Sequence, residues 1–445
     1  MPLGLLQIAS SIYGKYDVKL IDQRVDRNWK KHLLKKLNEN PLCVGITSIT
    51  GKQISYALET SRYIKENSNV PIVWGGVHPT LESYSTIRNR FIDFVIEGEG
   101  EIAFCKLVDA LSKNKNLKKV EGIWFKKKNQ IRKGPKRKLI NMDQILPLPY
   151  GLINVKDYLR GKKEEKRFLL ETSRGCPNNC IFCSSNYLGQ ICWRSKSFGN
   201  VIKEINYIQD HFCGITNIEL VDSNFFADYK RSKKILMEIK NRGFKLWIPG
   251  TEIYQLSDYI RNNDLPLLEE SCSYMGLGVE SGSNKVLRNI KKNITVNQAV
   301  YFNRKLKKYD ITLNYNFMSG FPNESMTDLK MTVSLMLKLI KENKNSIAGP
   351  VNPLQLLPKT EIFENAILKG LKRPEKLEDW IKFDVSLKNK LNNLPWLNKK
   401  RKRLLKKIYL KSLFLNDQSA YMDSEIIRRS LSLFRSLNCL NLRKY

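Results

Sequence analysis

Short apolar runs alternate with amphipathic stretches over the first 125 residues of the chain. Apolar runs of this length are typical of buried strands, and the stretches between them repeat their apolar positions at helical spacing. The predicted strands are 18–22, 43–47, 71–76 and 93–96, and the predicted helices are 28–39, 52–66 and 101–113. Because strands and helices alternate, we predict a parallel, doubly wound α/β sheet over residues 1–125.

A second alternation of strands and helices runs over residues 166–370. Its predicted strands are 168–173, 216–221, 245–249, 274–279, 311–317 and 351–357, and its predicted helices are 197–212, 229–242, 295–308 and 325–342. Repeated βα steps of this kind fit a partial (β/α)6 barrel, in which the chemistry lies at the carboxyl ends of the strands. The second predicted domain is therefore also of the α/β class.

Two further segments complete the predicted organisation. Residues 126–165 join a basic stretch to a proline-containing one, which predicts a hairpin followed by a linker. Residues 371–445 are rich in lysine and predict a helical C-terminal region, with the densest charge run at 399–403. That run fits either a solvated helix face or a surface for an anionic lipid, a nucleotide-linked substrate or RNA.

The chain is strongly basic, with 77 Lys+Arg against 43 Asp+Glu and a net charge of +34. Proteins that read nucleic acid bases depend on arginine, and the chain is enriched in lysine instead. We therefore do not expect nucleic acid as its partner. No signal peptide and no run of about 18 apolar residues is present, so we expect a cytoplasmic protein without a transmembrane segment.

Three of the nine cysteines occur together as C-x3-C-x2-C, at Cys176, Cys180 and Cys183. They directly follow the predicted strand 168–173, where a barrel of this type places its chemistry. A glycine and a proline within the loop allow the backbone to curve around a ligand. In a reducing compartment, clustered cysteines of this kind bind a metal or react.

Three thiolates leave two kinds of metal site open. A structural zinc ion needs four ligands, and Cys192 or Cys213 could supply the fourth. An iron–sulfur cluster held by three cysteines instead leaves one iron open to a small chelating ligand.

The spacing C-x3-C-x-aromatic-C, with Phe182 as the aromatic residue, resembles the radical S-adenosylmethionine (SAM) superfamily. This resemblance implies that the three cysteines hold a [4Fe–4S] cluster, whose fourth iron is chelated by the amino and carboxylate groups of SAM. It also implies that one electron from the cluster cleaves the sulfonium and yields a 5′-deoxyadenosyl radical. The cofactor supplies this chemistry, and the protein supplies geometry and excludes water.

The resemblance extends over residues 168–370 through five further segments. These segments are 193–197, 220–226, 278–283, 316–324 and 356–360. The resemblance implies that SAM is contacted by Phe182, Arg194, Asp222, Glu280, Ser281, Gly282, Gly320, Pro358 and Thr360. Asn323 and Lys359 depart from the pattern, since each stands where the family has glycine.

The first 125 residues resemble the cobalamin-binding domain that precedes many radical SAM barrels. The matching segments are 2–5, 45–48, 51–53, 74–80 and 97–101. This resemblance implies that the nucleotide tail of cobalamin is lined by Ser48, Thr50, Gly75, Gly76 and Gly98. Glycines at strand ends independently favour a site where a large ligand approaches the backbone.

Two features depart from the cobalamin-binding pattern. No D-x-H-x-x-G segment is present, and we expect His78 to be a turn residue rather than a cobalt ligand. In the family, the segment that corresponds to residues 2–5 follows a complete first strand, whereas here it follows Met1. We therefore expect this chain to lack that strand.

The resemblance implies an enzyme that methylates an unactivated carbon of a biosynthetic intermediate, using a [4Fe–4S] cluster, SAM and cobalamin. One SAM would methylate cobalamin, and a second would generate the radical that activates the carbon. We expect a small-molecule, lipid-linked or nucleotide-linked substrate, and an electron donor such as flavodoxin or ferredoxin.

Three alternatives remain at this stage. The same architecture supports radical oxidative cyclisation or rearrangement without methyl transfer, as in the anaerobic magnesium-protoporphyrin ester cyclases. A non-catalytic cobalamin- or metal-binding protein with a decayed barrel is the alternative of another class. A methylthiolating tRNA enzyme is disfavoured, because only Cys43 and Cys105 precede the barrel and no second cysteine triplet exists.

Overall fold

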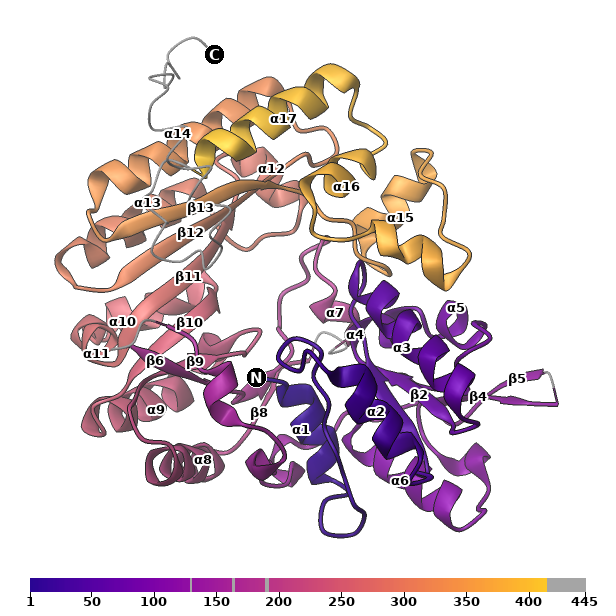
Figure 1. Ribbon diagram of the computed structural model, residues 1–445. Helices are drawn as coiled ribbons and strands as arrows, with labels where there is room; N and C mark the ends of the chain where they lie inside the picture. Colours follow the sequence, from indigo (N-terminus) through magenta and orange to yellow (C-terminus); the bar gives the residue numbers. More distant parts are fainter. Residues whose placement is uncertain (129, 162–164, 189–191, 414–445) are drawn as a thin grey trace.

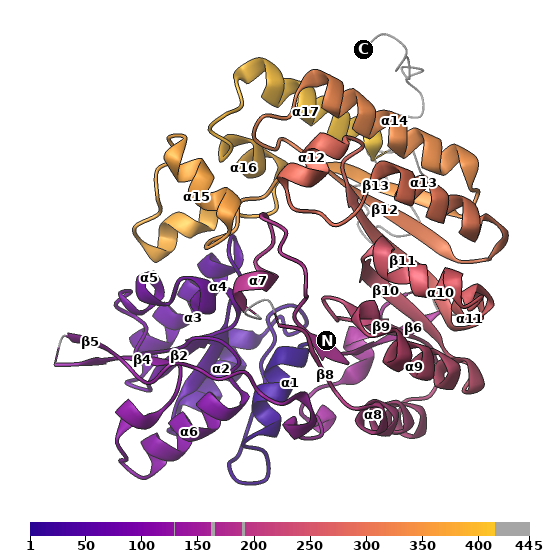
Figure 2. The same ribbon diagram turned by 180° about the vertical axis from the view of Figure 1, so that it is seen from behind.

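The computed structural model describes residues 1–128, 130–161, 165–188 and 192–413. Figure 1 shows two α/β units that face each other, with a C-terminal helical region beside both. The N-terminal unit carries the colours from indigo to purple, and the second unit curves around from magenta to orange. Figure 2 shows the same arrangement from behind.

The N-terminal unit is built on one five-stranded sheet in the order β1-β2-β3-β4-β5. Its strands are β1 (Val44–Thr47), β2 (Ile72–Gly75), β3 (Phe94–Ile96), β4 (Ile123–Lys127) and β5 (Gln130–Lys133). The first three strands are parallel, and β4 and β5 form an antiparallel hairpin on the edge of β3. The basic stretch that predicts a hairpin therefore extends the front sheet.

Helices precede, connect or follow the parallel strands of this unit. They are α1 (Leu3–Ser10), α2 (Trp29–Leu37), α3 (Gln53–Asn67), α4 (Val77–Leu81), α5 (Ser83–Ile87) and α6 (Glu101–Ser112). In α3, the buried positions Ile54, Ala57, Leu58, Ser61 and Ile64 recur at helical spacing and face the sheet.

The prediction of a strand at 18–22 is wrong, because these residues form no regular secondary structure. An extended segment becomes a strand only when a neighbour pairs with its backbone N–H and C=O groups. The sheet ends at β1, which pairs with β2 alone among the described residues. Residues 18–20 and 45–47 instead line the same cavity, with no ladder between them.

The second unit is a curved sheet of six parallel strands in the order β13-β12-β11-β10-β9-β6. The strands are β6 (Lys166–Leu170), β9 (Ile215–Leu220), β10 (Lys245–Thr251), β11 (Cys272–Glu280), β12 (Thr312–Ser319) and β13 (Ser346–Pro353). This topology confirms the predicted partial barrel. The last strand begins earlier than predicted, since Gly349 and Pro350 interrupt its apolar pattern, and a proline is tolerated because β13 is an edge strand.

Helices cover the outer face of this curved sheet (Figure 1). They are α8 (Phe198–His211), α9 (Tyr229–Asn241), α10 (Ser257–Arg261), α11 (Leu265–Ser271), α12 (Asn284–Asn289), α13 (Val296–Lys305) and α14 (Met326–Glu342). The helix α15 (Glu361–Leu368) instead lies beside the front unit (Figures 1 and 2). The short pair β7 (Ser173–Arg174) and β8 (Arg194–Ser195) and the helix α7 (Ser185–Leu188) lie between β6 and α8.

The C-terminal region packs on both units. It contains the 3-10 helix η8 (Leu377–Lys382) and the helices α16 (Leu387–Asn392) and α17 (Lys399–Ser412). Trp380 of η8 is buried against Phe363 and Phe383, and its ring lies 5.7 Å from that of His78 in the front unit. Of the predicted helical region, residues 414–445 lie outside the described residues.

One hydrophobic core runs through both units, from Leu6 and Trp74 in the first to Phe168 and Met275 in the second. Within the described residues, none of the helices combines the length and apolar character that crossing a membrane requires.

A tight backbone approach in the barrel generates a stability prediction. A Cβ added to Gly282 would lie 2.3 Å from the carbonyl oxygen of Met331, which is backbone of α14 and cannot move aside. We expect Gly282→Ala to destabilise the protein by about 1–3 kcal/mol through overpacking, and to lower its melting temperature. Gly199→Ala is the matched control, because a Cβ there meets nothing within 4 Å. Equal melting temperatures of the two variants would contradict this prediction.

Candidate functional site

The cysteine loop lies at the carboxyl end of β6, between β7 and α7. Gly175 precedes it with a φ of +83°, and a Cβ at this position would lie 1.9 Å from the carbonyl oxygen of Cys192. Glycine is therefore required both for the backbone conformation and for the close approach of the neighbouring chain. The structure thus places Cys176, Cys180 and Cys183 where the strand-and-loop pattern predicts them.

Burial favours the protonated form of the Cys176 and Cys180 thiols. Cys180 is 6% exposed, and burial raises the pKa of its thiol to about 12. Burial also raises the pKa of Cys176, whose Sγ accepts a hydrogen bond from Asn224 Nδ2 at 3.5 Å. Electrostatic repulsion from Cys183 also raises the pKa of Cys176 and that of Cys180. The three thiols therefore lie close enough to interact electrostatically. A metal must therefore displace protons to bind here.

Among the described residues, no further ligand joins the cysteine triplet to complete a zinc site. Within the described part of the chain, no three His, Cys, Asp or Glu side chains converge as ligands of one ion. In a four-iron cluster each cysteine binds a different iron, so the thiols stand further apart. Cys213 is exposed, and the Cys192 thiol donates to the carbonyl oxygen of Trp193 at 3.8 Å, so neither joins the triplet.

Asp222, at the end of β9, holds the start of the cysteine loop. Its carboxylate accepts hydrogen bonds from Thr172 N at 2.7 Å, from Thr172 Oγ1 at 2.5 Å and from Ser173 Oγ at 2.6 Å. Burial raises its pKa, while these hydrogen bonds lower it. The Asp222 carboxylate, which is predicted to contact SAM, thus forms its described hydrogen bonds with groups of the protein. Its evident effect is to fix the position of the cysteine loop.

A buried ion triad stands beside the cysteine loop. Lys292 Nζ lies 2.7 Å from Glu252 Oε1 and 3.4 Å from Glu280 Oε1, and its side chain is 4% exposed. Burial raises the pKa of Glu280, and the charge of Lys292 opposes that rise. The charge of Lys292 also lowers the pKa of Cys180.

Glu280 occupies this place in a strained conformation, since its φ is +66°. A non-glycine residue adopts this region only where its surroundings hold it there, and such positions cluster at functional sites. Sequence reasoning found Glu280 but missed Lys292 and Glu252. No local pattern marks these two residues, which come from separate βα units and meet only in the folded chain.

Ser281 and Gly282, also predicted to contact SAM, pack against α14. Ser281 Oγ lies 3.1 Å from Thr332 Oγ1, and Gly282 N donates to the same oxygen at 3.0 Å. Both residues directly follow the end of β11. Their evident contribution is to fix the turn that follows Glu280.

The turn after β12 is held by the C-terminal region. Gly320 N donates to Glu324 Oε2 at 2.8 Å, and Gly320 O accepts from Trp396 Nε1 at 2.9 Å. Asn323, which replaces a family glycine, has a φ of +61°, so the left-handed turn is preserved without glycine.

The last segment predicted to contact SAM closes on the cysteine loop. Lys359, the other replaced glycine, has a φ of +65°. Thr360 Oγ1 caps α15 by accepting from Phe363 N at 3.3 Å, and Pro358 is buried directly before this turn. Ile362 N donates to the carbonyl oxygen of Ile181 at 3.1 Å, which brings the first turn of α15 against the cysteine loop.

Two aromatic and charged positions complete the predicted SAM set. The ring of Phe182 lies 6.1 Å from the ring of Phe321, which links the cysteine loop to the turn after β12. Arg194 lies on the opposite side of the loop, where its guanidinium pairs with Glu99 at 2.5 Å. Phe182 thus lies within the cysteine loop and Glu280 lies close to it, whereas Arg194 pairs with the front unit.

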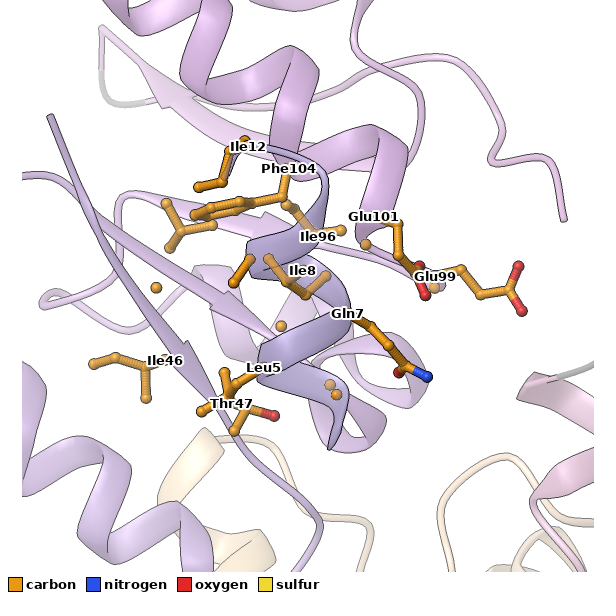
Figure 3. Close-up of a pocket in the computed structure, with 18 of the residues that line it drawn as sticks. Leu5, Gln7, Ile8, Ile12, Ile46, Thr47, Ile96, Glu99, Glu101 and Phe104 are labelled. Carbon is orange, nitrogen blue, oxygen red and sulfur yellow. The ribbon is translucent and has the colours of Figure 1, made fainter. Parts of the chain in front are cut away.

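A cavity of about 710 Å³ lies between the two units. Figure 3 shows apolar side chains of α1, β1 and α6 along it, including Ile8, Ile46 and Phe104, with Glu99 and Glu101 at one end. Its walls also include residues of the barrel, as far as Gly175 beside the cysteine triplet. The cavity thus connects the edge of the front sheet with the cysteine loop.

Three of the five residues predicted for cobalamin line this cavity, namely Gly75, Gly76 and Gly98. A Cβ added to Gly75 would meet nothing within 4 Å, so a ligand can approach this backbone from the cavity. Ser48 and Thr50 are buried and are not among its lining residues.

His78 is buried in α4 behind this strand edge and is not among the cavity-lining residues. Its Nδ1 lies 3.0 Å from Thr50 Oγ1, and burial lowers its pKa to about 3. His78, expected in a turn, therefore lies in a short helix. Its side chain is neutral and belongs to the core.

The Arg401–Glu324 pair generates a pH-dependent prediction. Burial raises the pKa of Glu324 to about 7, although Arg401 NH2 lies 3.2 Å from Glu324 Oε2 and lowers it. Below pH 7 the carboxyl is protonated in the folded protein, and removal of Arg401 costs little. Above pH 7 it is ionised and requires its partner. We therefore expect Arg401→Met to lower the melting temperature more at pH 8 than at pH 6.

The control for this prediction is Lys400→Met, since that neighbour on α17 is exposed. Its melting temperature should change equally at both pH values. An equal loss at pH 6 and pH 8 in Arg401→Met would show that packing, not charge, accounts for its effect.

Comparisons with known proteins match both units. Residues 170–336 match the radical SAM superfamily, and residues 1–108 match the B12 binding domain. An uncharacterized methyltransferase of Pyrococcus horikoshii is 32% identical over 417 residues, which cover 92% of this chain and 87% of that protein. The two matches confirm the predicted cobalamin-binding domain and radical SAM barrel, and with them the predicted cofactor classes.

Two more distant proteins show the same organisation. Anaerobic magnesium-protoporphyrin IX monomethyl ester cyclase of Synechocystis is 24% identical over 328 residues, which cover 72% of this chain and 64% of that protein. The structure of the cobalamin-dependent S-adenosylmethionine radical enzyme OxsB, solved with aqua-cobalamin and S-adenosylmethionine, matches with a TM-score of 0.70. It is 17% identical, and the match covers 98% of this chain and 73% of that chain, so this likeness concerns the fold.

The cysteine loop at the end of the first barrel strand, the two matched domains and the identity to the Pyrococcus protein over nearly the whole chain agree. The chain is an enzyme of the radical SAM superfamily and belongs to those members that carry a B12 binding domain before the barrel.

Proposed function

We propose that this enzyme is a cobalamin-dependent methyltransferase that methylates an unactivated carbon of a small biosynthetic intermediate. The observation that carries the proposal is the cavity, which is lined by Gly75 and Gly98 in the front unit and by Gly175 beside the cysteine triplet. A methyl carrier bound at the sheet edge and a radical generated at the cysteine loop would thus share one enclosed space. The similarity to a methyltransferase of Pyrococcus horikoshii supports the same reading.

The residues present fit the three cofactors. Cys176, Cys180 and Cys183 supply the three thiolates of a [4Fe–4S] cluster, which leaves one iron for SAM. The triad of Glu252, Glu280 and Lys292 offers buried charges of both signs beside the cysteine loop, which would suit the amino and carboxylate groups of SAM. When bound, the cluster supplies one electron for cleavage of the SAM sulfonium, and cobalamin supplies the methyl carrier.

The protein's own residues contribute geometry and exclusion of water. Asp222 holds Thr172 and Ser173, and thereby the start of the loop that carries the thiols. Lys292 holds Glu280 in its left-handed conformation at the end of β11. Buried apolar walls keep water from a reactive carbon, which is the contribution a protein makes to cofactor chemistry of this type.

The second candidate function is radical oxidative cyclisation or rearrangement. It is favoured by the similarity to the Synechocystis ester cyclase, which extends over 72% of this chain. We propose in either case that a low-potential protein such as flavodoxin or ferredoxin supplies the electron.

The cysteine triplet generates the first test. We expect Cys176→Ala, Cys180→Ala and Cys183→Ala each to abolish iron incorporation and reductive cleavage of SAM after anaerobic reconstitution, because each removes one of three ligands. The controls are Cys213→Ala, at an exposed position, and Cys192→Ser. Metal loss in Cys192→Ser equal to that in the triplet variants would instead favour a four-thiolate zinc site. Failure of the reconstituted wild-type protein to cleave SAM would favour a non-catalytic binding protein.

A labelling experiment tests the group transferred. With SAM labelled in its methyl group, reduced enzyme, cobalamin and candidate substrates, we expect the label to reach cobalamin and then the product. Formation of 5′-deoxyadenosine without transfer of the label would overturn methylation and favour the cyclisation alternative. Methionine released by radical cleavage keeps the labelled methyl group, so labelled methionine gives an internal measure of the SAM consumed by that step.

A further inference from the structure

Five charged side chains meet where the two units adjoin, and we call them the interdomain charge cluster. Glu99 and Glu101 come from the front unit, while Glu171, Arg174 and Arg194 come from the barrel. All five line the cavity and are largely buried, with side-chain exposures from 8% to 16%. They carry three negative and two positive charges when ionised.

Arg174 is the centre of this cluster. Its NH2 lies 2.7 Å from Glu101 Oε1 and 3.0 Å from Glu171 Oε2, and its NH1 lies 3.5 Å from Glu99 Oε1. A planar guanidinium with five N–H donors can serve three carboxylates at fixed angles, whereas a lysine ammonium is a flexible point charge. Arg174 thus links the first turn of α6 to the strand that directly precedes the cysteine loop.

The second arginine completes the link. Arg194 is paired with Arg174 across the β7–β8 ladder, so the two like charges stand side by side. Glu99 lies between them, with Oε1 2.5 Å from Arg194 NH2. The other oxygen of Glu99 accepts from the backbone N of Ile140 at 2.8 Å, which attaches the linker to the same cluster.

The front unit contributes a further contact through α1. Gln7 Nε2 donates to Glu171 Oε2 at 2.6 Å, and the same oxygen accepts from Arg174 Nε at 3.0 Å. Burial raises the pKa of Glu171, and the positive charge of Arg174 opposes that rise. Both helices that flank the cavity, α1 and α6, are therefore connected to residues that start the cysteine loop.

Stability alone does not account for such a cluster. Burying charged groups costs desolvation energy that their attraction only partly offsets, and apolar side chains of the same volume are often as stabilising. The units already share a continuous apolar core. Directional charge pairs fix the register of the two units more precisely than an apolar contact does, because a displacement of the units leaves buried charges unpaired.

We propose that Arg174 is a positioning residue that fixes the cysteine loop relative to the front unit, and so sets the separation of the two cofactor sites. The structural part of this proposal concerns the protein alone. Its consequence for methyl transfer rests on the proposed function. Arg174 lies two residues before Cys176, so a shift of its guanidinium moves the start of the cysteine loop relative to the front unit.

Hydrogen–deuterium exchange of the unreconstituted full-length protein tests the structural part. We expect Arg174→Gln to increase exchange about tenfold or more in peptides that cover residues 98–107 and 173–188, because a buried charge-assisted contact is lost. Arg174→Lys should restore part of the protection. The control is Arg304→Gln, which removes a bidentate pair with Glu342 on the exposed surface of the barrel unit and should leave both peptides unchanged.

Unchanged exchange in both peptides of Arg174→Gln would overturn the proposal. Should that variant fail to fold, Glu101→Gln removes the partner from the front unit instead, and the same exchange criterion applies. An increase confined to residues 173–188 would also overturn it, since Arg174 would then order only its own loop.

A second readout separates positioning from cluster assembly. After reconstitution, we expect Arg174→Gln to retain iron, the electron paramagnetic resonance spectrum of the reduced cluster and SAM cleavage close to wild type. Transfer of the methyl label should fall about tenfold or more, as expected for a small displacement of reacting groups. Equal losses of SAM cleavage and methyl transfer would contradict positioning. Absence of methyl transfer in the wild type would overturn the proposed function, while the exchange experiment still decides the structural part.

Discussion

The conformation of the cysteine loop is the constraint on which the rest of this structure depends. A loop that carries cluster ligands has little regular secondary structure, so its neighbours must hold it. Asp222 binds its beginning through Thr172 and Ser173, and Gly175 allows the neighbouring backbone to approach. In the middle, Ile181 donates to Ile290 O at 3.2 Å and accepts from Ile362 N at 3.1 Å. Elements from three different βα units thus converge on one loop.

Charge is used differently inside the protein and on its surface. The net charge of +34 arises from a large excess of lysine, and the basic run of α17 is largely exposed. Within that run, however, Arg401 turns to the buried Glu324 and stabilises the turn after β12. Near the cysteine loop, by contrast, positive charges are balanced by carboxylates, as Lys292 is by Glu252 and Glu280. Buried charges here have named partners, because an unpaired ion in a low-dielectric interior is costly.

Much of the fold could be predicted because its signals are local. Apolar runs and helical spacing occupy short stretches, and the six barrel strands were found in order. The prediction failed at 18–22, where the local pattern is that of a strand but no neighbouring backbone pairs with it. Asn323 and Lys359 stand where the family has glycine, and both adopt the left-handed conformation that glycine would provide. The two turns therefore form without glycine.

The sequence by itself determined the proposed donor set and its place at the end of the first barrel strand. Cys176, Cys180 and Cys183 are recognisable because cluster ligands within one loop must keep a fixed local spacing. Only the tertiary structure decided which charges meet around them. Glu99 pairs with Arg194 across 95 positions, and Glu324 with Arg401 across 77. Such pairs depend on how separately formed elements dock against each other, and no spacing rule along the chain encodes that docking.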